Sequence, residues 1–369
     1  MEFLPVTQGS LLQAAEVLRR GGLVAFPTET VYGLGADAYN AAAIAKVFEV
    51  KGRPRFDPLI IHIAAAETLE YAADLSQLTE ETKQKLYLLT KEFWPGPLSL
   101  ILPKSDKIPG IATAGLSTAA FRIPDHDAAL KLISLSGGAV AAPSANPFGA
   151  LSPTKAEYVR DKLGGKVDII IDGGATKVGV ESTVLDITGD SAKILRPGGT
   201  PKEAIEKLIG PVEDGSPSSA QGVFVSPGQL KSHYAPKTRL KVFPREEMIN
   251  LPYEKGRAFL FFDGSARDEW LKAQTKDTSV KCASLRSAAA IRVLSETGST
   301  TEAAACFFET LHEFDKCNSG DNCNSVNNCN TLNCCDLENC LEISCIYAQL
   351  APQEGLGAAI NDRLRRAGA

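Results

Sequence analysis

Short apolar runs alternate with helix-patterned segments through the first 210 residues of this chain. The apolar runs are bounded by glycine, proline or polar turns, as buried strands are, and apolar residues at helical spacing fill the segments between them. This alternation predicts an α/β domain over residues 1–210. The expected strands lie at 23–27, 58–64, 97–103, 118–124, 139–145, 167–174, 181–188 and 192–198, and the expected helices at 11–20, 41–53, 128–137 and 201–210.

A second, smaller α/β domain is predicted over residues 237–369. Residues 211–236 are rich in Pro, Ser and Gly and lack periodicity, which predicts a linker between the domains. Two domains agree with the length of 369 residues, because one hydrophobic core seldom organises that many. In the second domain we expect strands at 238–244, 257–264, 280–285 and 346–352, and helices at 287–298, 301–315 and 355–367.

An Asn-rich segment, residues 317–345, holds seven of the nine cysteines and has no Lys or Arg. It begins at the end of one expected helix and ends where an expected strand begins, so we interpret it as a loosely ordered insertion. Zinc sites built from cysteine use pairs such as C-x-x-C, and none occurs here. We therefore expect no metal site in the protein.

The composition is that of a globular protein, with 44% apolar and 22% charged residues. A net charge of −5 argues against binding long nucleic acids through bulk electrostatics. No apolar run is long enough for a membrane span, and the first residues lack the features of a secretory signal. We expect a cytoplasmic protein.

Polar and glycine-rich segments follow or precede the predicted strands of the first domain. Ligands in α/β proteins bind where such loops converge at strand ends, so these segments are candidates for one site. The common phosphate-binding and dinucleotide-binding glycine motifs are both missing from the sequence. The candidate segments are 27–37, 51–63, 117–124, 142–154 and 181–186.

Basic and amide side chains in these segments are suited to anions. Lys51 and Arg53 provide a point charge and a planar fork for a polyphosphate or carboxylate, or they form a solvated turn after a helix. Ser144 and Asn146 follow a buried strand, where they can cradle an anion or simply form a turn.

Two polar residues interrupt apolar strands. Arg122 requires a carboxylate from the protein or from a ligand, and the sequence does not decide between them. His62 is more typical of a hydrogen-bonded core residue than of a catalytic one.

The candidate segments also share their motifs with a known family. They carry, in order, P-T-E-T-V-Y-G-L-G-A-D, K-x-R-P-x-x-x-P-L-x-x-H, T-x-x-x-R-x-P, A-P-S-A-N followed by S-P-T, and V-E-S-T-V-L-D. Residues 5–210 thereby resemble the threonylcarbamoyl-AMP synthases with a YrdC domain. The later S-P-G-x-x-x-x-H-Y-A-P and E-G-L-G-A-A-I-N-D-R-L resemble the two-domain members. The resemblance implies a YrdC-like twisted mixed sheet, with helices that form a concave nucleotide site, and a smaller Rossmann-like C-terminal domain.

The resemblance implies a nucleotidyltransferase. L-Threonine and bicarbonate would form N-carboxythreonine, which attacks the α-phosphorus of ATP, releasing pyrophosphate and leaving threonylcarbamoyl-AMP. A separate transferase complex would then use this product to make threonylcarbamoyladenosine next to the anticodon of tRNA. The linker would pass over the mouth of the active site.

The resemblance also assigns residues. It implies Lys51, Arg53, Ser144 and Asn146 as the catalytic set, with Mg²⁺ accompanying ATP. Where the family usually has Asn, this chain has Asp57, whose carboxylate would repel a triphosphate unless Mg²⁺ intervenes. Contacts with ATP are implied for Arg53, Asp57, Thr118, Ser144, Ser152, Arg196 and Tyr234, and contacts with threonine for Thr30, His62, Arg122, Ala142 and Ser182.

Two alternatives belong to other functional classes. A YrdC-like protein could bind structured RNA without making the adenylate, although the complete Lys51, Arg53, Ser144 and Asn146 set argues against this. A hydrogenase-maturation enzyme would add acylphosphatase and zinc-finger regions, which the sequence lacks. Threonine-dependent consumption of ATP separates the synthase from both.

Overall fold

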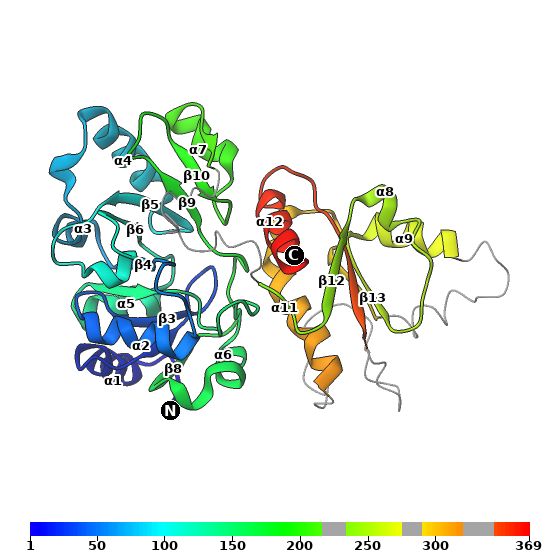
Figure 1. Cartoon of the computed structure of the whole chain (residues 1–369), viewed down its shortest axis with the longest axis horizontal. Coiled ribbons are helices and arrows are strands. Elements are labelled where there is room, and N and C mark those ends of the chain that lie inside the picture. The colour runs from blue at the N-terminus through cyan, green and yellow to red at the C-terminus, as the bar shows by residue number, and fades with distance from the viewer. Residues whose placement is uncertain (216–233, 275–289, 320–342) are drawn as a thin grey trace. The chain divides into compact units, whose positions relative to one another are not determined.

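The computed structural model describes residues 1–215, 234–274, 290–319 and 343–369 (Figure 1). The described chain divides into two compact units. The first contains the residues up to Phe148 and those from Ser152 onward, and the second contains Gly149–Leu151 and the described residues from Tyr234. Among the described helices, none combines the length and apolar character needed to cross a membrane.

The first unit is built on an eleven-stranded mixed sheet in the order β1-β8-β2-β3-β7-β4-β6-β5-β9-β10-β11. In its centre β4 runs parallel to β6, whereas β7 is antiparallel to β4 and β5 is antiparallel to β6. The strands are β1 (Glu2–Pro5), β2 (Val24–Phe26), β3 (Gly33–Asp37), β4 (Ile60–Ile63), β5 (Leu98–Pro103), β6 (Thr118–Arg122), β7 (Ala139–Ala142), β8 (Ile169–Asp172), β9 (Thr183–Asp186), β10 (Lys193–Arg196) and β11 (Glu213–Asp214).

Seven α-helices are described in this unit, and local signals fix their ends. Asn40 caps one of them by accepting from the N–H groups of Ala42 and Ala43, and Gly52 ends the same helix in the left-handed conformation. The helices are α1 (Gln8–Arg19), α2 (Ala41–Lys51), α3 (Ala66–Ala72), α4 (Glu80–Phe93), α5 (Asp127–Ser136), α6 (Ala156–Leu163) and α7 (Lys202–Ile209).

The two faces of the sheet have different surroundings. On one face Ile61, Phe121 and Leu185 belong to the largest apolar core, together with residues of α2 and α4. On the other face α1 and α5 cover β2, β7 and β8. On that second face the central strands carry a small apolar cluster of Ile60, Ile101, Ala120 and Val184.

The second unit contains a four-stranded sheet in the order β12-β15-β13-β14, in which every described pairing is parallel. Its core is aromatic, with the rings of Phe259 and Trp270 4.6 Å apart. The elements are β12 (Arg239–Phe243), α8 (Arg245–Met248), β13 (Arg257–Asp263), α9 (Gly264–Gln274), β14 (Ala290–Ser295), α11 (Thr300–Ser319), β15 (Cys345–Gln349) and α12 (Gly357–Ala367). An α/β fold with a large mixed sheet and a second, parallel sheet was predicted, and the structure confirms it.

Some expected elements differ from the structure. The helix expected at 287–298 is wrong, because Ala290–Ser295 is strand β14 and pairs with β13. Gly33–Asp37, expected as part of a turn, is strand β3. The strand expected at 280–285 lies outside the described residues. Of the segment 317–345, α11 includes Cys317, β15 begins at Cys345, and residues 320–342 are not described.

Candidate active site

Strand register places several predicted site residues on the same face of the first sheet. His62 pairs with Arg122, and Ile60 pairs with Ala142, so these side chains point to one side. Arg196 pairs with Val184 of the small apolar cluster and shares that side. This is the face on which α1 and α5 pack against β2, β7 and β8.

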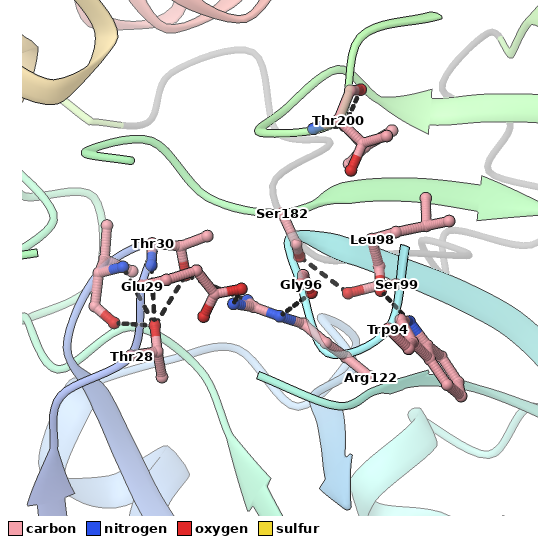
Figure 2. Close-up of polar contacts among 12 residues, drawn as sticks. Thr28, Glu29, Thr30, Trp94, Gly96, Leu98, Ser99, Arg122, Ser182 and Thr200 are labelled. Carbon is pink, nitrogen blue, oxygen red and sulfur yellow. Dashed lines mark hydrogen bonds and ion pairs between the residues drawn. The ribbon is translucent and has the colours of Figure 1, made fainter. Parts of the chain in front are cut away.

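Arg122 is the centre of a buried polar network at the end of β6 (Figure 2). Its guanidinium pairs with a carboxylate oxygen of Glu29 at 2.5 Å, and both side chains are 3% exposed. It also donates to the Thr30 hydroxyl and to the carbonyl of Gly96, each at 3.1 Å. The structure therefore supplies a protein carboxylate for the buried arginine, which is one of the two partners that the sequence left open.

The loop between β2 and β3 holds Glu29 and Thr30 rigidly. The Thr28 hydroxyl lies 2.8 Å from the Thr30 hydroxyl and donates to the Val31 carbonyl at 2.7 Å. The carbonyl of Glu29 accepts from the N–H of Val178 at 2.7 Å. Both ends of the loop are therefore tied down, and the two side chains are aimed at Arg122.

A second cluster joins Ser182, Ser99 and Arg196. The Arg196 guanidinium donates to the Ser182 carbonyl at 2.9 and 3.1 Å and to its hydroxyl at 3.1 Å. The Ser182 hydroxyl lies 2.8 Å from that of Ser99, as Figure 2 shows. Ser182, a predicted threonine contact, is thus hydrogen-bonded to Arg196, a predicted ATP contact.

His62 is buried among apolar and cationic neighbours. Its ring meets Phe26 edge to face, with the ring centroids 6.1 Å apart. Burial, and then the charge of Arg122, lowers the pKa of His62 to about 3. The imidazole is therefore neutral at physiological pH and acts here as a hydrogen-bonding group.

Lys51 ends α2 and points its ammonium group at the loop after β7. Its Nζ donates to the carbonyl of Ser144 at 2.5 Å and to the carbonyl of Asn146. Burial, reinforced by the neighbouring Arg53, lowers the pKa of Lys51 well below its usual value. A negatively charged ligand would favour the ammonium form, so this position is suited to an anion.

Arg53 and Asp57 form a buried ion pair beside Lys51. The guanidinium lies 2.8 Å from the Asp57 carboxylate and donates to the carbonyls of Asp57 and Pro58 at 3.0 and 2.9 Å. Burial raises the pKa of Asp57, although Arg53 and Lys51 oppose the shift. Apart from this contact with Arg53, its carboxylate oxygens have no hydrogen-bond partner among the residues that the structure describes.

Electrostatic coupling connects the clusters. The charge of Arg196 opposes the burial that raises the pKa of Asp57, and the charge of Glu181 opposes the burial that lowers the pKa of Lys51. Ser152 donates to Glu181 at 2.5 Å. The predicted ATP residues Arg53, Asp57, Ser144, Ser152 and Arg196 therefore lie in one polar region rather than at scattered positions.

Two predicted residues stand apart from these hydrogen bonds. Thr118 begins β6 opposite Pro103 and is half-buried. Tyr234 belongs to the second unit, where it has a positive φ of 63° and its ring lies 4.9 Å from the Arg363 guanidinium. The structure does not relate Tyr234 to the polar region of the first unit, so its contact with ATP stays a prediction.

Three residues of the polar region are not among those that the motifs assigned: Glu29, Ser99 and Glu181. Glu29 and Glu181 were visible inside P-T-E-T and V-E-S-T as single acids among small polar residues. Such an acid in a segment expected to be buried needs a partner, and that requirement was the available signal. Ser99 gave none, because a serine inside a strand is ordinary.

Comparison with protein families covers nearly all of the chain. Residues 16–198 match the family described as telomere recombination, and residues 200–369 match the threonylcarbamoyl-AMP synthase C-terminal domain. The threonylcarbamoyl-AMP synthase of Pyrococcus abyssi is 39% identical over 96% of this chain and 92% of its own length. That of Bacillus subtilis is 49% identical over 65% of this chain and 68% of its own.

A solved structure is similar over the full length. The crystal structure of P. abyssi Sua5 complexed with L-threonine superposes with a TM-score of 0.77 at 35% identity. The match covers 100% of this chain and 97% of that one. Both units of the fold are therefore shared with that protein.

Proposed function

The chain belongs to the threonylcarbamoyl-AMP synthases and is a nucleotidyltransferase, and from this we propose that it makes threonylcarbamoyl-AMP and pyrophosphate from L-threonine, bicarbonate and ATP. The observation that carries the proposal is the similarity to the P. abyssi enzyme over 96% of the chain. The polar region described above supplies residues for each part of the reaction.

Threonine is the substrate best supported, because the similar P. abyssi protein was solved with L-threonine. In this chain the hydroxyl groups of Thr30 and Ser182 and the guanidinium of Arg122 lie on or beside one sheet face. A guanidinium is the natural partner of an amino-acid carboxylate. Threonine would therefore share Arg122 with Glu29.

ATP would be held by the cationic end of the region. Lys51, Arg53 and Arg196 are buried and electrostatically coupled through Asp57. Fixed cations in a site without water stabilise charge that develops on a transferring phosphoryl group and on departing pyrophosphate. Catalysis would rest on this stabilisation and on positioning, with the carbamate oxygen of the substrate as nucleophile.

Mg²⁺ is proposed to accompany ATP. The residues fit the ion, because Asp57 offers a buried carboxylate in which Arg53 contacts one oxygen and the other has no partner among the described residues. Mg²⁺ usually takes one or two protein carboxylates together with substrate phosphates. When bound it would offset the charge of the phosphates, and Asp57 would hold it while Arg53 fixes the carboxylate.

The product would pass to a separate transferase complex that modifies tRNA, and we place the protein in the cytoplasm, where that substrate is found. The net charge of −5 supports transfer of a small adenylate over tight binding of tRNA by this chain itself. The alternative of an RNA-binding protein without synthase activity finds no separate support in the described residues.

The test is pyrophosphate release from the purified protein with ATP, bicarbonate and Mg²⁺, with and without L-threonine. We expect release that requires threonine and Mg²⁺ and that falls at least about 100-fold in Lys51→Ala, the loss typical of removing one charge-stabilising donor. Lys46→Ala is the matched control, since Lys46 lies on the same helix and, in the described part of the chain, donates to the carbonyl of Gly21 alone. Release that is independent of threonine, from folded protein, would reject the synthase.

A further inference from the structure

The residues assigned to threonine offer no negative charge to its ammonium group. Threonine carries an ammonium group near neutral pH, and only the neutral amine can attack bicarbonate. His62 is a neutral imidazole beside the Arg122 cation, so it is not an anionic partner for the ammonium. Arg122 is a cation, and the remaining assigned contacts are made by hydroxyl groups and by the backbone near Ala142.

Glu29 is the carboxylate beside these groups. It is 2% exposed, and one of its oxygens lies 2.5 Å from the Arg122 guanidinium. Apart from this ion pair, the oxygens of Glu29 have no hydrogen-bond partner among the residues that the structure describes, and the second oxygen has no partner there at all. A buried carboxylate has a strong requirement for donors, so this side chain can accept one more cationic partner.

The position of Glu29 matches the two ends of an amino acid. Arg122 and Glu29 present opposite charges at 2.5 Å on neighbouring segments, as Figure 2 shows. The carboxylate and ammonium of an amino acid are also neighbouring opposite charges, so the two pairs are complementary. The Thr30 hydroxyl, which Arg122 already contacts, lies next to Glu29 in the chain.

We propose that Glu29 binds the ammonium group of threonine and takes a proton from it, which makes Glu29 a catalytic residue for formation of the carbamate. This inference rests on the proposed function. The ammonium gives one proton to the Glu29 carboxylate. The lone pair of the amine then forms a bond to the carbon of bicarbonate, the bond from that carbon to its hydroxyl breaks, and the departing hydroxide leaves as water with a second proton from nitrogen.

The other charged groups around Glu29 allow this role. Arg122 contacts Glu29 from β6. The charge of Glu29 also acts on His126, which precedes α5. Asp125, Asp127 and Lys177 also act on His126. Burial lowers the pKa of His126, so its imidazole is neutral near pH 7 and Arg122 is the cation in direct contact with Glu29. After carbamate formation the proton would leave Glu29 for solvent.

The binding test compares threonine with its α-hydroxy analogue, 2,3-dihydroxybutanoate, which keeps the carboxylate and the side-chain hydroxyl but has no ammonium. Isothermal calorimetry measures both in the full-length protein and in Glu29→Gln, Glu29→Asp and the control Glu16→Gln, whose side chain is 42% exposed. We expect the preference for threonine to fall about tenfold or more in Glu29→Gln, as for a lost bond to a charged group, and to persist in part in Glu29→Asp.

The kinetic test follows pyrophosphate release from pH 7 to pH 9. In Glu29→Gln we expect a lower kcat whose deficit shrinks by about tenfold at the higher pH, because more of the threonine is then neutral in solution. If Glu29 only positions Arg122, Glu29→Gln weakens the binding of threonine and of 2,3-dihydroxybutanoate equally. The loss of kcat in that variant is then the same at pH 7 and pH 9. Either result overturns the inference. A wild-type protein that shows the preference but releases no pyrophosphate would support Glu29 as the ammonium site and reject the proposed function.

Discussion

Arg122 shows how much one residue depends on its surroundings. Among the described residues, its contacts come from two separate segments, the loop that holds residues 29 and 30 and the loop that holds residue 96. Removing one partner of a buried charge typically costs about 3–5 kcal/mol, because the remaining charge is left without compensation. Loss of either member of the Glu29–Arg122 pair is therefore strongly destabilising, whereas a ligand group of the same charge can replace one member.

A pH prediction belongs to His62. Its pKa is about 3 in the folded protein and about 6.5 when unfolded, so folding favours the neutral form. The resulting stability is fully present above pH 6.5 and is lost as the pH falls toward 3. Between pH 7 and pH 5.5 we expect protonation of His62 in the unfolded chain to lower the unfolding free energy of the wild-type protein by about 1 kcal/mol. The His62→Gln variant should not show this decrease.

Urea unfolding at the two pH values, without ligands, measures this difference between wild type and variant. The comparison isolates His62 from other groups that titrate in the same range. An identical pH dependence in the two proteins would contradict the neutral, buried imidazole.

For single residues, the sequence showed which buried charges need a partner but not which residue supplies it. It showed that Arg122 requires a carboxylate, but the partner, Glu29, is set by a contact across 93 positions of the chain. The pairing of Lys51 with the carbonyls after β7 likewise depends on tertiary packing. Residue types at a site can therefore be predicted before the contacts between them.

Among the elements, β9 and β10 and the loop after them form a tightly packed frame around Ser182. A Cβ at Gly198 would lie 2.3–2.4 Å from the backbone of residues 181–183. Real Cβ atoms do not approach that closely, so only glycine fits without movement. The frame thereby fixes the segment that carries both Glu181 and Ser182.

Gly198→Ala should destabilise the protein by about 1–3 kcal/mol, as overpacking does, and should raise the KM for threonine because Ser182 moves. Gly165→Ala is the matched control, since a Cβ there meets nothing within 4 Å. Thermal unfolding and threonine-dependent pyrophosphate release measure the two effects. Equal behaviour of the two variants would show that the segment adjusts freely.

The expected helices at 11–20, 41–53, 128–137 and 201–210 are present in the structure, but α4 (Glu80–Phe93) and α6 (Ala156–Leu163) were not expected. The alanine-rich start of 287–298 suggested a helix, yet Ile291 and Val293 lie in β14, where pairing with β13 decides the structure. Gly33–Asp37 lacks the side chains of a typical strand, but Gly35 faces Phe26 and Val140, where a Cβ would come within 3 Å of both. In both cases long-range packing overrode local preference.

The whole molecule consists of two units with separate cores. Two α/β units joined by a linker were predictable from the alternation of elements and the change of composition between them, whereas the mixed first sheet and the Rossmann-like second domain were implied by the family resemblance. The arrangement of strands was not, because sequence periodicity does not say which strands become neighbours.

A prediction for the whole chain concerns the Cys- and Asn-rich segment. Replacing residues 320–342 with a short Gly-Ser linker should leave threonine-dependent activity within about twofold, because closure entropy grows only slowly with loop length. Removing 317–345 entirely should destabilise the second unit, since Ile343 and Cys345 are buried there. Activity and thermal unfolding of the two variants check this. A large loss in the first variant would show that residues 320–342 contribute to folding.

The pairing of β1 with β8 has a consequence for the chain as the ribosome makes it. Residues 2–5 leave the ribosome well before their partner strand, residues 169–172. At about 5–20 residues per second, β1 stays without its partner strand for roughly ten to thirty seconds during translation. Newly made N-terminal segments are thus exposed to chaperones and to one another for longer than the local helices are, so translation speed before residue 172 should influence the yield of folded protein.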